Sequence, residues 1–179
     1  MSDEGEFKMS SSYKLKVLLC GPVGCGKKDL IMPYIKSNFQ DDTLTSNIDI
    51  LTKDVKLANS SICTLSIWDI QGQERLSYIR STLYKGAAGA ILVFDLTRKA
   101  TWDEVKKYRE EVKQFAGDIP FLLIGNNVDK LETSDNVVDR DECRQYAEHQ
   151  GLFYIETSFK DSRNVEEGIS KLVNKIAGS

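Results

Sequence analysis

An apolar run that opens directly into a glycine-rich loop, at residues 14–28 (KLKVLLCGPVGCGKK), is the feature that most constrains this chain. The spacing G-x-x-x-x-G-K at 21–27 is typical of a phosphate-binding P-loop, in which backbone N–H groups turn inward around an anion. A helix expected over 29–36 would add its N-terminal dipole behind the loop, and Lys27 would reach the β- and γ-phosphates. Lys28 departs from the pattern, because the loop usually closes with Ser or Thr, whose hydroxyl holds Mg²⁺. The alternative is an ordinary glycine-rich turn with two solvated lysines.

Composition indicates a globular protein and excludes several classes of function. The 179 residues suit one domain, and 41% apolar with 28% charged residues is a normal balance. A net charge of −3 gives no footprint for general nucleic-acid binding. The four cysteines have no C-x-x-C spacing, so buried thiols in a reducing compartment are expected. The sequence shows no transmembrane run, secretion signal or lipidation motif, so we expect a cytoplasmic protein without a membrane anchor in this chain.

Hydrophobic periodicity predicts an α/β fold. We expect a disordered N-terminal lead over 1–12 and a single P-loop domain over 13–179. Two alternating segments form a predicted hairpin, continuous apolar runs predict buried strands, and amphipathic segments predict helices. The hairpin covers 50–57 and 62–68; the strands cover 89–96, 120–125 and 152–156; the helices cover 74–84, 101–115 with Thr101 as N-cap, 139–150 closed by Gly151, and 165–177. The sheet is therefore mostly parallel, with one antiparallel edge.

Four polar clusters fall where predicted strands end, at 21–28, 69–73, 126–129 and 157–160. Ligands of open α/β sheets bind at the carboxyl ends of the strands. The sequence therefore predicts one composite site at this edge of the sheet.

These segments resemble a small GTPase of the Ras superfamily, with the Rab branch as the nearest match over residues 13–177. WDIQGQERL at 68–76 resembles the family's W-D-T-A-G-Q-E-R-F, YKGAAGAILVFDLT at 84–97 resembles the stretch that follows it, and ETSFK at 156–160 resembles E-T-S-A-K. Asn126-x-x-Asp129 matches the guanine motif. The resemblance implies a small G-domain with a six-stranded, mostly parallel sheet, one antiparallel edge strand and about five flanking helices.

The resemblance also implies how GTP or GDP would be held. Asp129 would accept hydrogen bonds from the guanine N1–H and exocyclic amine, and Asn126 would brace the base and the P-loop. The remaining implied nucleotide contacts are Val23, Gly24, Cys25, Gly26, Lys27, Lys28 and Asp29 in the P-loop, Phe39 and Lys160 against the base, Gly72 at the γ-phosphate, and Asn127, Ser158 and Phe159 around the guanine. A plain turn remains the alternative for 126–129, and core packing the alternative for Phe39.

For metal binding and hydrolysis, the resemblance gives Asp69 the Mg²⁺ contact through water and Gln73 the orientation of the attacking water. The first-switch threonine that contacts Mg²⁺ and the γ-phosphate has three candidates. Matching the segment that follows favours Thr45, the family interval from Phe39 favours Ser46, and Asn47 would remove the hydroxyl.

Several departures from the family pattern change these expectations. Val23 stands where the family has Gly or Ser, so its branched side chain should crowd the attacking water and slow hydrolysis. Asn127 replaces a lysine that flanks the nucleotide, which should loosen binding, whereas Phe159 replaces alanine at a position that acts through its backbone. Lys28 implies that Mg²⁺ binding is weakened or absent. Its ammonium either stands near Asp69 in the space of the metal or turns out to solvent.

The sequence thus predicts a guanine-nucleotide switch with slow GTPase activity, of the Rab type that serves membrane traffic. Effector, exchange-factor and GAP proteins would contact loops 38–49 and 69–82. The alternative is a degenerate G domain that acts as a binding or scaffold module. An ATP-using P-loop kinase is disfavoured by the guanine motif and by the missing lid segment.

Overall fold

The chain folds around a six-stranded sheet. The structure is a computed structural model that describes residues 13–35, 48–70, 77–160 and 163–178. The strand order is β2-β3-β1-β4-β5-β6. Only the edge pair β2–β3 is antiparallel among the described strands, and the other four pairs are parallel. The strands are β1 (Lys14–Cys20), β2 (Ile48–Lys56), β3 (Ile62–Ile70), β4 (Gly89–Asp95), β5 (Phe121–Asn126) and β6 (Phe153–Glu156).

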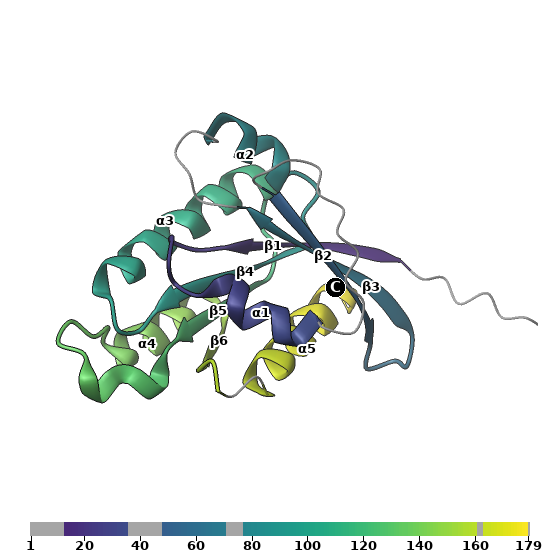
Figure 1. Cartoon of the computed structure of the whole chain (residues 1–179). Coiled ribbons are helices and arrows are strands. Elements are labelled where there is room, and N and C mark those ends of the chain that lie inside the picture. Colours follow the sequence, from purple (N-terminus) through teal and green to yellow (C-terminus); the bar gives the residue numbers. More distant parts are fainter. Residues whose placement is uncertain (1–12, 36–47, 71–76, 161–162, 179) are drawn as a thin grey trace, which may run out of the picture.

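Helices cover both faces of this sheet, so the molecule has three layers (Figure 1). The α-helices described are α1 (Lys27–Ile35), α2 (Ser77–Tyr84), α3 (Lys99–Ala116), α4 (Arg140–Gln150) and α5 (Arg163–Ala177), and a short 3-10 helix, η2, covers Val128–Thr133. One apolar core lies under α1 and α5, and the other lies under α2, α3 and α4.

Side-chain alternation along the buried strands builds these two cores. In β1, Val17 and Leu19 belong to the core under α1 and α5, whereas Leu18 and Cys20 belong to the opposite one. β4 and β5 are buried along their whole length, between helices on both faces of the sheet. This burial on both faces explains why their sequences are continuous apolar runs.

The described part of the chain confirms the predicted fold class, with five α-helices and an antiparallel edge strand. Asp139 and Gly151 do bound α4: the Asp139 carboxylate accepts from two backbone N–H groups, and Gly151 is left-handed. The assignment of Thr101 as N-cap of α3 was wrong. The N-cap is Arg98, and Thr101 lies inside the helix, where its hydroxyl bonds the β4 end at Asp95.

Other expectations concern the thiols, the lead and the membrane. All four cysteines are free and buried, as predicted. The expected lead over 1–12 and residues 74–76 of the predicted helix lie outside the described residues. Among the helices that the structure describes, none has the length and apolar character needed to cross a membrane.

Candidate nucleotide-binding site

The predicted polar clusters meet at the carboxyl edge of the sheet, because β1, β3, β5 and β6 all end there. Asn126, the last residue of β5, donates its side-chain N–H to the Cys25 carbonyl at 3.0 Å. Its own side-chain oxygen accepts from the Thr157 hydroxyl at 3.3 Å. Backbone bonds from Thr157 to Gly125 and from Val128 to Thr157 complete the connection. One buried amide therefore links three of the four clusters.

The P-loop adopts the left-handed turns that glycine permits. Gly24 and Gly26 have φ values of +77° and +81°. A Cβ at Gly26 would also lie 2.7 Å from the Asn126 side-chain nitrogen, so the close approach of the two segments needs a residue without a side chain. After this turn, the Leu30 N–H bonds the Gly26 carbonyl at 3.0 Å and α1 begins.

A small cavity of about 250 Å³ opens between the P-loop and the cluster after β5. Its lining includes Gly24, Gly26, Asp29, Asn126, Asn127 and Phe159, all predicted site residues, together with Leu30 and Lys130, which the sequence did not single out. Asp129 lies in η2 and is not among the lining residues; its carboxylate is 3.9 Å from the Lys160 ammonium. Ser158 is buried in the loop between Thr157 and Phe159.

Lys27 faces the buried carboxylate of Asp69 at the end of β3. The Lys27 ammonium is 3.6 Å from Asp69 Oδ1, a distance longer than a hydrogen bond, and that oxygen has no hydrogen-bond partner among the described residues. Burial raises the pKa of Asp69 above its ordinary value, although the Lys27 charge works in the opposite direction. The pair places one positive and one negative group side by side at the mouth of the P-loop.

Lys28 forms a second lysine–aspartate pair next to the first. Its ammonium is 2.5 Å from Asp49 Oδ2, on β2. Asp49 is the antiparallel register partner of Asp69, so the two carboxylates sit opposite each other on neighbouring strands. The sequence offered two alternatives for Lys28, a place near Asp69 or a turn to solvent. In the structure the Lys28 ammonium forms an ion pair with Asp49, and its charge also acts to lower the pKa of the neighbouring Asp69. The ion pair ties the start of α1 to the start of β2.

These residues fit Mg²⁺ poorly. Mg²⁺ requires near-octahedral oxygen ligands. Here an ammonium stands where the loop hydroxyl belongs, and the two nearby carboxylates, Asp49 and Asp69, each face a lysine. In the parts of the chain that the structure covers, no group of three His, Cys, Asp or Glu residues could hold a metal ion. The predicted ligand Thr45 lies outside the described residues.

Arg98 is a site residue that sequence reasoning missed. Its guanidinium donates to Asp95 Oδ2 at 3.1 Å and to the Val23 carbonyl at 3.4 Å, so it connects the end of β4 to the P-loop. Burial alone would raise the pKa of Asp95, but hydrogen bonds from Thr97, Asn127 and Arg98 lower it overall. The sequence signal that could have identified this residue is an arginine three residues after the aspartate that ends a predicted strand.

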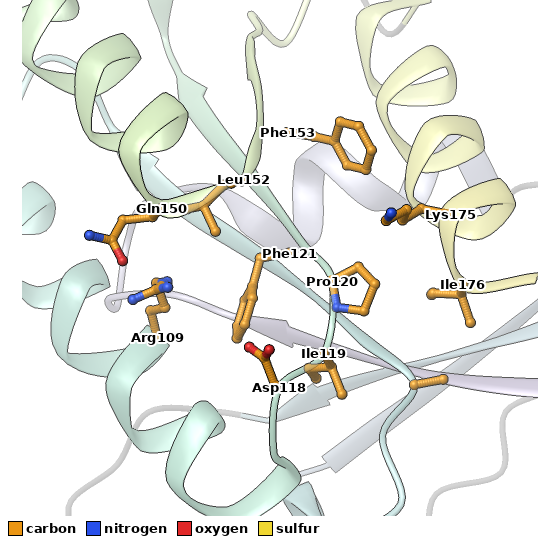
Figure 2. Close-up of a pocket in the computed structure, with 12 residues that line it drawn as sticks. Arg109, Asp118, Ile119, Pro120, Phe121, Gln150, Leu152, Phe153, Lys175 and Ile176 are labelled. Atoms are coloured by element: carbon orange, nitrogen blue, oxygen red, sulfur yellow. The ribbon is translucent and has the colours of Figure 1, made fainter. Parts of the chain in front are cut away.

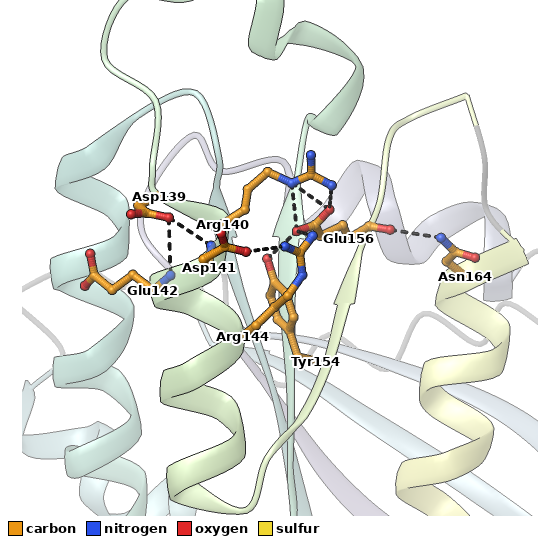
Figure 3. A network of polar contacts seen from close by, with 8 residues as sticks. All are labelled: Asp139, Arg140, Asp141, Glu142, Arg144, Tyr154, Glu156 and Asn164. Carbon is orange, nitrogen blue, oxygen red and sulfur yellow. Dashed lines mark hydrogen bonds and ion pairs between the residues drawn. The ribbon is translucent and has the colours of Figure 1, made fainter.

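A charged network supports the loop that carries Ser158 and Phe159 (Figure 3). The Glu156 carboxylate, at the end of β6, accepts from Arg140 through Nε at 3.0 Å, and also through its terminal nitrogen. It accepts further from Arg144 at 3.3 Å and from the Tyr154 hydroxyl at 2.9 Å. Burial would raise the pKa of Glu156, but the Arg140 and Tyr154 donors outweigh it and lower the pKa below its ordinary value. The network joins β6 to α4 directly before the predicted guanine loop.

Four predicted site residues and two first-switch alternatives cannot be placed. Phe39, Thr45, Gly72 and Gln73, with Ser46 and Asn47, lie outside the described residues. The structure brings the other predicted residues to one edge of the sheet, and their individual roles toward a nucleotide stay predictions.

Comparison with known proteins assigns the family. The model of the Ras family matches residues 16–178. Ras-related protein RGP2 of Oryza sativa subsp. japonica is 33% identical over 169 residues, which cover 93% of this chain and 76% of the relative. GTP-binding protein ypt3 of Schizosaccharomyces pombe is 33% identical over 178 residues, covering 98% and 80%. Ras-related protein Rab11A of Lotus japonicus is 31% identical over 174 residues, covering 96% and 76%. The chain belongs to the Ras family of small GTPases, whose members bind guanine nucleotides, and is related to Rab11-type proteins.

Proposed function

We propose that this protein is a Rab-type guanine-nucleotide switch that needs little Mg²⁺ to hold its nucleotide and hydrolyses GTP slowly. The observation that carries the proposal is the Lys28–Asp49 ion pair, because it puts a positive group at the P-loop position of the metal-binding hydroxyl. The second candidate, a degenerate G domain that works only as a binding module, is favoured by the same departure.

Nucleotide binding is supported by the construction of the loop after β5. The Asn126 amide holds the P-loop at Cys25, so the predicted base site and the predicted phosphate site are mechanically joined. Asn127 and Phe159 line the adjoining cavity, and Asp129, in η2, is the residue predicted to recognise guanine. A carboxylate that accepts two guanine N–H groups discriminates against adenine, since adenine leaves it unpaired.

Weak dependence on Mg²⁺ follows from the charges at the phosphate end. Two ammonium groups, Lys27 and Lys28, lie at the start of α1, whose N-terminus also favours anions. In most P-loops, the lysine at the position of Lys27 and a divalent metal together neutralise the charge of the phosphates. Here Lys28 supplies part of the charge without any requirement for octahedral geometry.

In this proposal, slow hydrolysis follows from Val23 and from weak binding of Mg²⁺. The Val23 side chain is 73% exposed at the tip of the P-loop, where a bound γ-phosphate and its attacking water would lie. Its carbonyl accepts a hydrogen bond from Arg98 at 3.4 Å. If Mg²⁺ is weakly held, it would stabilise less of the charge that develops on the transferred phosphoryl group.

Membrane-traffic signalling is the pathway class that the Rab relationship suggests. The partner surfaces would be loops 38–49 and 69–82, and Asp49 lies at the boundary of the first. In this proposal, the Lys28–Asp49 pair restrains the end of that loop in every nucleotide state.

The test is nucleotide affinity with and without metal. GDP and GTP are titrated into nucleotide-stripped protein in excess Mg²⁺ and in EDTA. We expect the affinity of the wild-type chain to change by less than about threefold, a difference below 1 kcal/mol. Lys28→Thr should restore metal dependence. Lys56→Thr removes the same charge from the exposed far end of β2 and is the matched control, which should behave as wild type.

Each outcome separates the alternatives. Affinity that collapses in EDTA for the wild-type chain would refute the metal-sparing site and leave an ordinary switch. Absence of binding in both conditions would leave only the binding module. Single-turnover hydrolysis of GTP by Val23→Gly should be faster than by the wild-type chain, and equal rates would remove Val23 from the argument.

A further inference from the structure

A second pocket lies at the amino edge of the sheet, opposite the nucleotide site. Its volume is about 520 Å³. Phe121 and Phe153, the first residues of β5 and β6, line it, whereas the nucleotide site uses the other ends of the same strands. Figure 2 shows Arg109 and Gln150 on one side, Lys175 on the other, and Pro120 and Phe121 between them.

The unusual component of this pocket is Arg109 on α3. The residue is only 6% exposed, and its Nε–H has no hydrogen-bond partner among the described residues. Its guanidinium contacts Glu110 Oε1 at 2.6 Å and lies 5.6 Å from the ring centre of Phe121. Glu110 is itself exposed, so its carboxylate is shared with water. The Nε atom is itself enclosed, so a ligand in the pocket would meet the terminal nitrogens of the guanidinium, one of which already contacts Glu110.

We propose that this pocket binds a small organic carboxylate, which Arg109 receives and Lys175 attracts from the opposite side. The guanidinium presents a planar fork of donors that matches a carboxylate. One acidic residue, Asp118, lines the pocket; its side chain is 94% exposed and lies 4.0 Å from the Lys113 ammonium.

The walls determine the class of anion. Ile119, Pro120, Phe121, Leu152 and Ile176 are apolar, so a ligand with a hydrophobic body gains from burial beside them, whereas free phosphate does not. A concave volume of this size is typical of small-molecule sites, which lie between about 300 and 1,000 Å³. An aromatic or branched aliphatic acid satisfies both the cation and the walls.

The experiment titrates phenylacetate into the isotope-labelled full-length chain and follows backbone amide shifts by NMR. We expect saturable shifts at residues 118–121 and 150–153, with a dissociation constant of about 1 mM or lower. Phenylacetamide has the same shape without the charge, and inorganic phosphate has charge without the apolar body. Both should bind at least about tenfold more weakly, a difference of 1.4 kcal/mol.

Two variants and a matched control test the role of the cations. Arg109→Met keeps the length of the side chain and should lose at least tenfold in affinity. Its melting temperature should equal or exceed that of the wild type, because an apolar residue replaces an incompletely paired buried charge. Lys107→Met removes a charge from the exposed face of the same helix and should bind normally. Lys175→Met, at an exposed position, should weaken binding and keeps the test valid if Arg109→Met fails to fold.

The outcomes decide the proposal independently of nucleotide binding. Absence of saturable shifts below about 10 mM phenylacetate would overturn it. Equal binding of phenylacetamide, or equal affinity of Arg109→Met, would show that the cation is not used and would overturn it too. Equal binding of phosphate would refute the role of the apolar walls. The titration uses the chain with and without GDP, and we expect the same affinity in both, since the two sites lie at opposite edges.

Discussion

Replacing Glu156 by glutamine tests whether the charged network behind the guanine loop stabilises the fold. The substitution keeps the volume of the side chain and one acceptor oxygen, but it removes the charge and turns an N–H₂ group toward donors. Arg140, Arg144 and Tyr154 would lose a charged acceptor. Glu156 is 13% exposed, so water replaces few of these contacts.

The magnitude follows from the exposure of each partner. A hydrogen bond to a charged group contributes about 1.5–3 kcal/mol when it is shielded. Arg140 and Arg144 are 43% and 49% exposed, so solvent screening reduces their joint contribution to about 1–2 kcal/mol. The half-buried Tyr154 hydroxyl adds about 1 kcal/mol. We therefore expect Glu156→Gln to lower the free energy of unfolding by about 2–3 kcal/mol at pH 7.

The assay is urea denaturation at a series of pH values, with Glu148→Gln as control. Glu148 is an exposed carboxylate on α4, and its loss should change stability by less than about 0.5 kcal/mol. The folded-state pKa of Glu156 is lowered, so its stabilisation is complete above the ordinary glutamate pKa of about 4.3. It is lost as the pH falls through the lowered pKa of the folded state. Equal stability of variant and wild type at pH 7, or a difference that persists unchanged in acid, would refute this reasoning.

Three further substitutions test the site by denaturation of nucleotide-stripped protein. Asn126→Ala should lower the free energy of unfolding by about 2–3 kcal/mol, because two buried hydrogen bonds are lost; an unchanged urea midpoint would contradict this. Gly26→Ala should cost clearly more than Gly86→Ala, since both have positive φ but only Gly26 faces an atom 2.7 Å from the new Cβ; equal losses would disprove the close approach. Asp69→Asn should raise the melting temperature at pH 7. The pKa of Asp69 is raised on folding, so its stabilising effect is complete below the ordinary aspartate pKa of about 3.9 and lost as the pH rises through the folded value. A melting temperature that falls would refute it.

Much of the fold was readable because buried parallel strands and glycine-rich turns have strong local signatures. The runs that became β4 and β5 are apolar on both faces, so each was recognisable without knowledge of its neighbours. The ends of helices were harder. Thr101 looked like a cap by residue type, but its hydroxyl is taken by the backbone of the preceding strand, a contact that only the tertiary structure reveals.

Arg109 shows the limit for helices. Its sequence context, among the charged residues of an amphipathic segment, gives no sign of burial. The structure nevertheless places it on the inner side of α3, beside the ring of Phe121. Hydrophobic periodicity predicts only roughly which side chains of α3 face the sheet. Whether a residue at the edge of the apolar face, such as Arg109, is buried depends on the neighbouring strand.

At the candidate site, the surroundings of Lys28 could likewise not be predicted from the sequence. Its ion pair explains how the fold tolerates a lysine in place of the usual Ser or Thr of the P-loop. Neighbouring residues on a helix point about 100° apart, so Lys27 and Lys28 leave α1 in different directions. The antiparallel register of β2 and β3 sets Asp49 opposite Asp69 and thereby supplies a separate acid for each lysine. A lysine in the hydroxyl position breaks the local rule of the P-loop, and its compensation lies 21 residues away on another element. The sequence contained both residues, but only the strand register brings them together. The fold itself therefore places the Lys28 ammonium beside Asp49, next to the P-loop.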